Sequence, residues 1–354
     1  MVERAQSRRR AREDLPGRAE ARAAGGGNYF AAPKPGVEFI PSGCLRLDLA
    51  LGGGWAECRI GNIVGDKSSG KTLLAIEAAA NFAIKYPKGK IRYREAESSF
   101  ERGYAAALGM PIERVDFGEP LDTVEDLFED LQRVIKGARQ PELYIVDSLD
   151  ALSDRAEMAR DMDEGTYGAQ KAKNMSQMFR RSVRAMAQSR VTGMIISQVR
   201  SKIGATFGRG TTRSGGRALD FYASQVLYVT SGEVDYKPYR GEKRATGISV
   251  RGRVDKNKIA LPYRDAAFQI LFGYGIDDVG ASLDWLKKIK ALEDVGISNS
   301  TSDKDLAKIK RQYVTLGGPE SPDLPASRAA IDEAVRQRWY EIEERFLPTR
   351  RKYG

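Results

Sequence analysis

The chain has 354 residues, enough for one large domain with smaller additions, because single hydrophobic cores stop growing at about 250 to 300 residues. Hydrophobic residues make up 41% and charged residues 30%, and no apolar run reaches the ~18 residues of a membrane-spanning helix, so such a helix is not expected. The formal charge of +10 is compatible with a polyanionic partner, for which the location of the charge is decisive, and the absence of histidine removes the commonest general base and zinc ligand.

Three regions follow one another along the chain. Residues 1–36 contain Arg8, Arg9 and Arg10 and then three consecutive glycines, which predicts a basic arm and a flexible linker. A solvated charged helix explains this arm about as well as a contact with DNA or a filament. Residues 37–276 form the predicted core, and residues 277–354 form a small, mostly helical C-terminal domain.

The core has the pattern of an α/β fold with a doubly wound, mostly parallel sheet. The predicted elements are a strand at 59–65, a helix at 71–85, a strand at 91–97, a helix around 124–136, a strand at 143–146, a helix at 175–188 and a strand at 194–197. Three later strands, at 226–230, 248–254 and 268–272, follow one another without helices. They predict an antiparallel extension of the sheet.

A phosphate-binding loop separates the first strand from the first helix. It has P-loop spacing and consists of Gly65, Asp66, Lys67, Ser68, Ser69, Gly70, Lys71 and Thr72. Its glycines let backbone N–H groups surround a β-phosphate, and the helix N-terminus adds positive potential. We expect Lys71 to reach the β and γ phosphates of ATP and the Thr72 hydroxyl to bind Mg²⁺. A chance glycine-rich turn is disfavoured by motif and context together.

Polar residues end the neighbouring strands at the same edge. Asp147 closes an apolar strand and is expected to orient the magnesium ion, directly or through water. Without histidine, the candidates for the residue that activates water are Glu95 and Glu97, and strand alternation places both on one face. Gln198 closes the fourth strand, where it can sense the γ-phosphate, although a lone strand-end glutamine is usually only a polar cap.

The chain resembles the RecA recombinase family, block by block and in order, from residue 39 to residue 276. The blocks that carry the resemblance are Ser42-Gly43 through Leu51-Gly52-Gly53, GDKSSGKT, EAESSFERGY, YIVDSLDAL, NMSQMFRR, ISQVRSKIGATFG, GGRALDFYAS and DKNKIALPYRDAAFQILFGYGI. The blocks beginning at Gln198 and Lys256 are far more specific than the P-loop. Glu95 and Ser98 depart from the family pattern, which has Asp and His there.

The resemblance implies a RecA-type ATPase whose nucleotide lies between neighbouring subunits of a helical filament. It assigns the catalytic carboxylate to Glu97 and the aromatic residue that stacks on adenine to Tyr104. It further implies that Gln198 couples the γ-phosphate to a DNA-binding loop, and that Lys256 and Lys258 reach the neighbour's ATP.

The predicted DNA-binding surface has two parts. The glycine-rich stretch 199–217 carries basic residues and no acidic one, which suits phosphate contact, and its apolar side chains can stack against bases. Its candidates are Arg200, Lys202, Ile203, Phe207, Arg209, Arg213 and Arg217. The helix within residues 168–190 is also basic, and its candidates are Lys173 and Arg180. A solvated surface loop is the alternative for the first stretch.

These features together predict an ATP-dependent recombination protein with ATP and Mg²⁺ as cofactors. It is expected to form filaments on single-stranded DNA and to pair that strand with homologous double-stranded DNA. The alternatives are a RecA-fold DNA motor or helicase, and a regulatory P-loop protein that binds DNA without catalysis. The presence of only two cysteines and the lack of a secretory segment predict a cytoplasmic location.

Overall fold

The computed structural model of the chain describes residues 34, 36–97, 99–158, 168–201, 211–213, 216–315, 321 and 323–348. The basic arm predicted for residues 1–36 therefore lies almost wholly outside the described part, as does Ser98. No helix among the described residues is long and apolar enough to cross a membrane.

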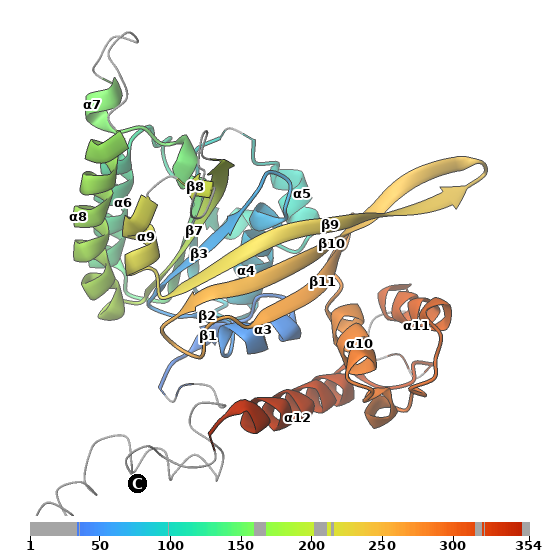
Figure 1. The fold of residues 1–354 in the computed structure, drawn as a ribbon. Helices are drawn as coiled ribbons and strands as arrows, with labels where there is room; N and C mark the ends of the chain where they lie inside the picture. Colours follow the sequence, from blue (N-terminus) through green and yellow to red (C-terminus); the bar gives the residue numbers. More distant parts are fainter. Residues whose placement is uncertain are drawn as a thin grey trace, which may run out of the picture.

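A ten-stranded sheet runs through the core (Figure 1). Its order from one edge to the other is β12 (Gly275–Ile276), β11 (Asp265–Leu271), β10 (Glu242–Asn257), β9 (Gln225–Tyr239), β3 (Ile60–Gly65), β7 (Val191–Ser201), β6 (Glu142–Asp147), β4 (Lys90–Glu95) and β5 (Val115–Asp116), with β8 (Thr211–Arg213) paired to β7. The strands from β9 to β5 are parallel, and β10, β11, β12 and β8 are antiparallel to their neighbours. The predicted α/β class and the antiparallel extension are confirmed.

Helices cover both faces of the parallel strands (Figure 1). The main ones are α4 (Lys71–Lys85), α6 (Val124–Gly137), α8 (Gly168–Ala187) and α9 (Gly216–Tyr222), while α3 (Leu45–Leu51) packs against the antiparallel strands β10 and β11. Strand β6 shows why two layers form: Leu143 and Ile145 join the core cluster that includes α4, whereas Tyr144 and Val146 join the cluster that includes α6 and α8. Successive side chains of a strand point to opposite faces, so the strand is apolar on both.

Helix α6 begins where its sequence dictates. The Thr123 hydroxyl accepts a hydrogen bond from the Asp126 backbone N–H, and the Asp126 carboxylate accepts one from the Thr123 backbone N–H, which completes a capping box. Val124, Leu127 and Leu131 are buried along one stripe of the helix. The predicted helix around residues 124–136 is thus formed with nearly the expected bounds.

Smaller elements complete the core and the C-terminal part. They are β1 (Phe39–Ile40), β2 (Trp55–Ala56), α5 (Arg102–Ala107), η1 (Ile112–Arg114), η2 (Leu149–Ala151), α7 (Arg155–Met158), α10 (Asp278–Lys288), η3 (Leu292–Val295), α11 (Asp303–Thr315) and α12 (Arg328–Phe346). The described residues after β12 are mostly helical, with turns and loops between the helices, and their treatment as a separate small domain stays a proposal.

A buried arginine joins α3 to the C-terminal helices. The Arg46 guanidinium carbon lies 4.0 Å from the ring centroid of Trp285 on α10 and 4.6 Å from that of Trp339 on α12. Arg46 is 5% exposed, and burial lowers its pKa to about 10. A guanidinium between two indole faces is held by cation–π attraction and stacking, which fixes α10 and α12 against the core.

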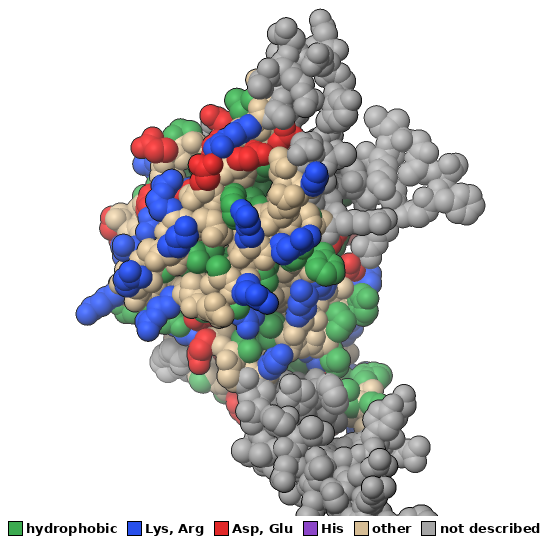
Figure 2. All heavy atoms as spheres, turned by 90° about the vertical axis from the view of Figure 1, so that its left-hand side faces the viewer, with side chains coloured by type: hydrophobic (Ala, Val, Ile, Leu, Met, Phe, Trp, Pro, Cys, Tyr) green, Lys and Arg blue, Asp and Glu red, His purple; other side chains and the backbone are tan. Residues whose placement is uncertain are grey.

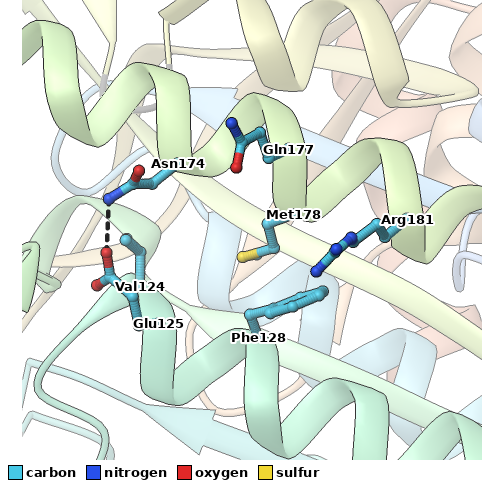
Figure 3. Close-up of a pocket in the computed structure, with 7 residues that line it drawn as sticks. All are labelled: Val124, Glu125, Phe128, Asn174, Gln177, Met178 and Arg181. Carbon is cyan, nitrogen blue, oxygen red and sulfur yellow. Dashed lines mark hydrogen bonds between the residues drawn. The ribbon is translucent and has the colours of Figure 1, made fainter.

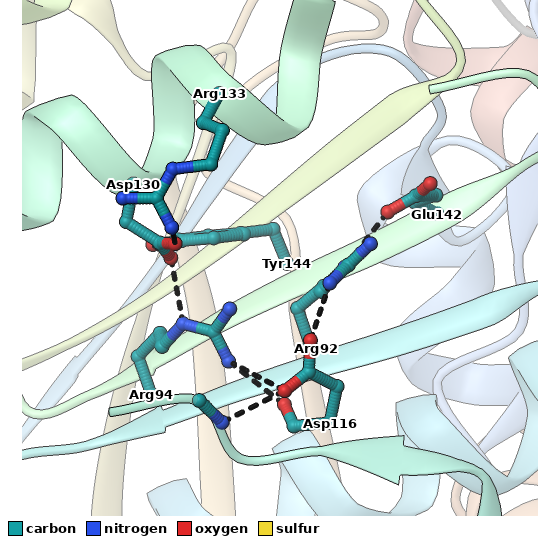
Figure 4. Close-up of polar contacts among 8 residues, drawn as sticks. Arg92, Arg94, Asp116, Asp130, Arg133, Glu142 and Tyr144 are labelled. Atoms are coloured by element: carbon teal, nitrogen blue, oxygen red, sulfur yellow. Dashed lines mark hydrogen bonds and ion pairs between the residues drawn. The ribbon is translucent and has the colours of Figure 1, made fainter. Parts of the chain in front are cut away.

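Arginines also cross-link the β4 edge of the sheet, which Figure 4 shows. Arg92 on β4 donates to Glu142 on β6, with 2.9 Å between Nε and Oε2, and also pairs with Asp116. Arg94 is 4% exposed, and its Nε lies 2.6 Å from Oδ2 of the buried Asp130 on α6. These ion pairs join β4 to β5, to β6 and to α6, so the network holds α6 against the sheet and β5 beside β4.

Candidate functional site

The P-loop lies at the carboxyl end of β3 and leads directly into α4. The helix begins at Lys71, and the residue before it, Gly70, has φ 89°, in the left-handed region. A Cβ added at Gly70 would lie 2.5 Å from Cδ1 of Ile270, so the backbone here approaches β11 too closely for a larger residue. The loop therefore presents the free N–H groups of the α4 N-terminus at the edge of the sheet, as phosphate binding requires.

Asp147 lies beside Thr72, at the end of this loop. The Thr72 hydroxyl donates to Asp147 across 2.8 Å between Oγ1 and Oδ2, and the Tyr93 hydroxyl donates to the same oxygen across 2.7 Å. Burial raises the pKa of Asp147, while the hydrogen bonds from Tyr93 and Thr72 oppose that rise. Lys71 donates to the main-chain oxygen of Asp66 across 2.6 Å, and burial lowers its pKa.

The donor set at this position fits a magnesium ion. Thr72 and Asp147 supply a hydroxyl and a carboxylate oxygen, which are ligands that Mg²⁺ prefers. The described residues hold no cluster of three or more acidic, cysteine or histidine side chains that could bind a metal by themselves. A magnesium ion held here would take its other ligands from phosphates and water, which is usual for this ion.

Glu95 and Glu97 have different surroundings, although both were candidates for activating water. Strand β4 ends at Glu95, whose Oε1 accepts hydrogen bonds from the backbone N–H groups of Glu97 and Ser99, each at 2.9 Å. Glu97 lies beyond the strand, and its Oε1 accepts from Nε2 of Gln198 at 2.8 Å and from the Ser148 hydroxyl. Glu95 therefore fixes the loop, whereas the exposed Glu97 carboxylate faces the end of β7.

Gln198 connects the P-loop edge with the segment that carries the predicted DNA-binding residues. Its backbone N–H donates to Oδ2 of Asp150 at 2.6 Å, which fixes the strand at this point. One residue further along β7, Val199 pairs with Arg213 of β8. The Glu97 contact and the start of the basic stretch thus lie on one continuous strand.

A hollow of about 270 Å³ lies next to the P-loop. Its walls include Tyr104 of α5, which is 43% exposed, and three residues of the antiparallel strands and the turn after them, Ile248, Ile270 and Phe272. A flat base can lie between aromatic and aliphatic side chains of this kind. Tyr104 was expected here, but the other three were missed, because apolar residues at strand ends otherwise indicate only a core.

The structure describes only some of the predicted DNA-binding residues. Lys202, Ile203, Phe207 and Arg209 lie outside the described residues, and Arg200, Arg213 and Arg217 are placed only by the backbone of β7, β8 and α9. Lys173 and Arg180 of α8 are exposed, and the Arg180 Nε donates to the Tyr222 hydroxyl of α9 at 3.2 Å. Figure 2 shows Lys and Arg side chains spread over this helical face. The face carries positive charge suited to a polyanion.

Lys256 and Lys258 lie at the end of β10, beside the C-terminus of α9. Their Nζ atoms lie 2.7 Å and 3.1 Å from the main-chain oxygen of Phe221, and both lie within 6 Å of its ring centroid. The Phe221 ring is itself exposed. Within one chain, therefore, the lysine pair interacts with the negative end of a short helix, where cations are favoured.

A second hollow lies between α6 and α8, away from the P-loop (Figure 3). Phe128 and Met178 line it, and Arg181 points over the Phe128 ring (Figure 3). Nδ2 of Asn174 donates to Oε1 of Glu125 at 2.7 Å. The described residues that line this hollow include neither the P-loop nor Asp147, so we do not assign the nucleotide to it.

Comparison with known proteins gives one consistent result. The model of the RecA N-terminal domain family matches residues 29–277. Protein RecA of Prochlorococcus marinus strain MIT 9211 is 40% identical over 311 residues, which is 87% of this chain and 80% of that protein. Protein RecA of Thermosynechococcus vestitus is 36% identical over 306 residues, which is 86% of this chain and 82% of that protein.

Proposed function

The chain belongs to the RecA family of recombination and repair proteins, and on this premise we propose that it is a DNA-dependent ATPase. It uses ATP with Mg²⁺, polymerises on single-stranded DNA and promotes pairing and strand exchange with homologous double-stranded DNA. The proposal rests on the 2.8 Å hydrogen bond from Gln198 Nε2 to Glu97 Oε1. This bond connects the proposed catalytic carboxylate beside the P-loop to strand β7, which leads into the basic residues 199–217.

The roles of the side chains follow from their positions. The backbone N–H groups from Gly65 to Thr72 surround the phosphates, and the Lys71 ammonium neutralises charge on the β and γ groups. A magnesium ion would be held by Thr72 with Asp147 beside it, and it would supply further charge neutralisation. Glu97 accepts a proton from the water that attacks the γ-phosphate, and Tyr104 stacks on the adenine.

DNA coupling follows from the same contact. When a DNA strand binds the basic residues 200–217, it also holds the part of β7 beyond Gln198, which strengthens the existing hold of Gln198 on Glu97. Positioning a base at the reacting atoms accelerates hydrolysis, so DNA should stimulate turnover. We assign the phosphate contacts to Arg200, Lys202, Arg209, Arg213, Arg217, Lys173 and Arg180, with Ile203 and Phe207 against the bases.

The first experiment measures ATP turnover with and without single-stranded DNA, beside imaging of the particles and a strand-exchange assay with homologous duplex. We expect stimulation by DNA, filaments and exchanged strands. Equal turnover with and without DNA would contradict the coupling through Gln198. Duplex unwinding by ring-shaped particles would instead favour the DNA motor or helicase.

A mixing experiment tests the lysine pair. We propose that Lys256 and Lys258 contact the γ-phosphate of the neighbouring subunit, a role for which a trans cation contributes ~10³ or more in rate. A Lys71→Ala protein and a Lys256→Ala, Lys258→Ala protein should each be nearly inactive alone. In random mixtures, roughly a quarter of interfaces combine an intact P-loop with intact lysines, so activity should return if the trans geometry applies.

Two results would contradict the assignment of the lysines. Silent mixtures whose co-assembly on DNA is demonstrated would mean that the lysines act within their own subunit. Near-normal activity of the double lysine variant alone would mean that the contacts with the Phe221 carbonyl only stabilise the end of α9.

A further inference from the structure

Tyr93 is a buried tyrosine whose hydroxyl reaches the candidate magnesium site. It lies on β4, is 0% exposed, and donates a hydrogen bond to Oδ2 of Asp147 across 2.7 Å. The Thr72 hydroxyl donates to the same oxygen across 2.8 Å. Among the residues that the structure describes, none donates a hydrogen bond to the other carboxylate oxygen, Oδ1. The protein thus holds this carboxylate by one oxygen only.

The ring of Tyr93 is fixed by an aromatic cluster. Its centroid lies 4.4 Å from that of Phe100 and 6.1 Å from that of Phe117, and the rings of Phe100 and Phe117 lie 5.6 Å apart. The Arg102 guanidinium carbon lies over the Phe117 ring, 4.2 Å from its centroid. A buried ring packed in this way has few orientations available, so its hydroxyl stays directed at Asp147.

Packing alone does not require the Tyr93 hydroxyl. A phenylalanine would fill the same cluster, and it would bury no polar group beside a buried carboxylate. The carboxylate itself needs donors, because Glu95 is paired with Asp147 in the register of β4 and β6, and neighbouring carboxylates repel each other. Burial raises the pKa of Asp147, and the charges of Glu97 and Glu95 add to that rise. The hydroxyl therefore serves the carboxylate rather than the core.

We propose that Tyr93 is a positioning residue for magnesium binding. Its hydroxyl and that of Thr72 together fix the plane of the Asp147 carboxylate, so that Oδ1 stays available to the ion or to a water molecule bound to it. Because the Thr72 hydroxyl spends its proton on Asp147, its lone pairs stay able to bind the ion. Groups that hold a metal ligand in place typically contribute roughly 10- to 100-fold to metal affinity. The inference rests on the proposed ATP-dependent function and adds a residue to its magnesium site.

A pair of variants isolates the hydroxyl. Tyr93→Phe removes only this group and keeps the ring in its cluster. Tyr144→Phe is the matched control, because the Tyr144 hydroxyl also donates across 2.7 Å to Oδ2 of a buried carboxylate, that of Asp130. Tyr144 belongs to the other core cluster, with α6 and α8, whereas Tyr93 belongs to the cluster that includes α4. Both variants lose one buried hydrogen bond, so only their effects on magnesium should differ.

The first readout is binding without turnover. A fluorescent, non-hydrolysable ATP analogue is titrated at increasing magnesium concentrations, and a parallel series uses Mn²⁺, whose free form is measured by electron paramagnetic resonance. In Tyr93→Phe the magnesium midpoint should rise roughly tenfold or more, and the affinity for Mn²⁺ should fall by the same factor. Tyr144→Phe should match the unaltered protein in both measurements, even where its melting temperature falls. A purely structural hydroxyl would change melting alone.

Turnover gives an independent signature. In Tyr93→Phe, ATP turnover should fall at limiting magnesium and return toward the unaltered rate as magnesium is raised, because the hydroxyl acts only through Asp147. A loss that excess magnesium does not restore would contradict the inference. Should the Tyr93→Phe chain fail to fold, Phe100→Leu takes its place, since it keeps the hydroxyl and removes the ring that packs closest to it. A raised magnesium midpoint in that variant would support the inference, and an unchanged one would overturn it.

The outcomes distinguish this inference from the proposed function. Equal magnesium midpoints and Mn²⁺ affinities in Tyr93→Phe and the unaltered protein would overturn the inference and leave the ATPase intact. An equal shift in Tyr144→Phe would also overturn it, because a general loosening of the core would then explain both variants. An unaltered protein that binds no ATP analogue, or that turns over ATP equally well without magnesium, would refute the proposed function and this inference together.

Discussion

Replacing Glu97 with Gln tests the assignment of the residue that activates water. The amide has nearly the same size, and its oxygen can still accept the hydrogen bonds from Gln198 and Ser148. What is lost is the anionic group that takes a proton. A positioned general base contributes at least ~10², so turnover should fall by that factor, which corresponds to about 2.7 kcal/mol of activation free energy.

Glu95→Gln is the matched comparison, because it makes the same chemical change two residues away. Its Oε1 accepts two backbone hydrogen bonds at 2.9 Å, which a neutral amide oxygen still accepts more weakly. We expect a loss in turnover of less than about tenfold, in line with a positioning role. Single-stranded-DNA-stimulated ATPase and binding of a fluorescent ATP analogue are measured for both variants. A Glu97 variant within threefold of the unaltered protein, or a larger loss for Glu95, would refute the assignment.

Three further variants have defined outcomes. Arg94→Ala leaves Asp130 buried without its closest cation and should lower the free energy of unfolding by ~3 to 5 kcal/mol in urea titrations; a loss below about 1 kcal/mol would mean that water reaches the carboxylate. Burial raises the pKa of Asp48 to about 7, so its contribution to stability is present at low pH and lost as pH rises from about 4 to 7. Asp48→Asn should therefore gain stability relative to the unaltered protein between pH 5 and pH 8, by up to roughly 3 kcal/mol in melting experiments, and a constant difference would contradict the shift. Phe272→Ala should raise the KM for ATP about tenfold at similar kcat in steady-state assays, as expected for lost uniform binding; an unchanged KM would remove it from the base pocket.

Local chemistry made the geometry of the candidate phosphate site predictable from sequence. The P-loop spacing and the apolar stripe of α4 give the same helix start, and the structure begins and ends that helix at the predicted residues, 71 and 85. Asp147 was predictable for a similar reason, because an acid that closes a continuous apolar strand must lie at the carboxyl edge of the sheet. Such features depend on neighbours in sequence.

Features that depend on distant contacts were not predictable in the same way. Alternation placed Glu95 and Glu97 on one face, but β4 ends at Glu95, so alternation does not apply to Glu97. Glu97 is hydrogen-bonded to Gln198 of β7, whereas Glu95 is hydrogen-bonded to the backbone of the loop that follows β4. The β9–β10 hairpin was underestimated, since its outer residues contact no core and show no apolar alternation from which a strand could be predicted.

The position of Arg46 between Trp285 and Trp339 provides an intrinsic optical probe. The chain has three tryptophans, and two of them lie at this contact between α3 and the C-terminal helices, while Trp55 is buried in the core. Separation of α10 and α12 from the core would remove the guanidinium from both indoles and admit water to them. Their emission would then change in wavelength and intensity, so movement of the C-terminal helices during a nucleotide cycle can be followed without any attached label.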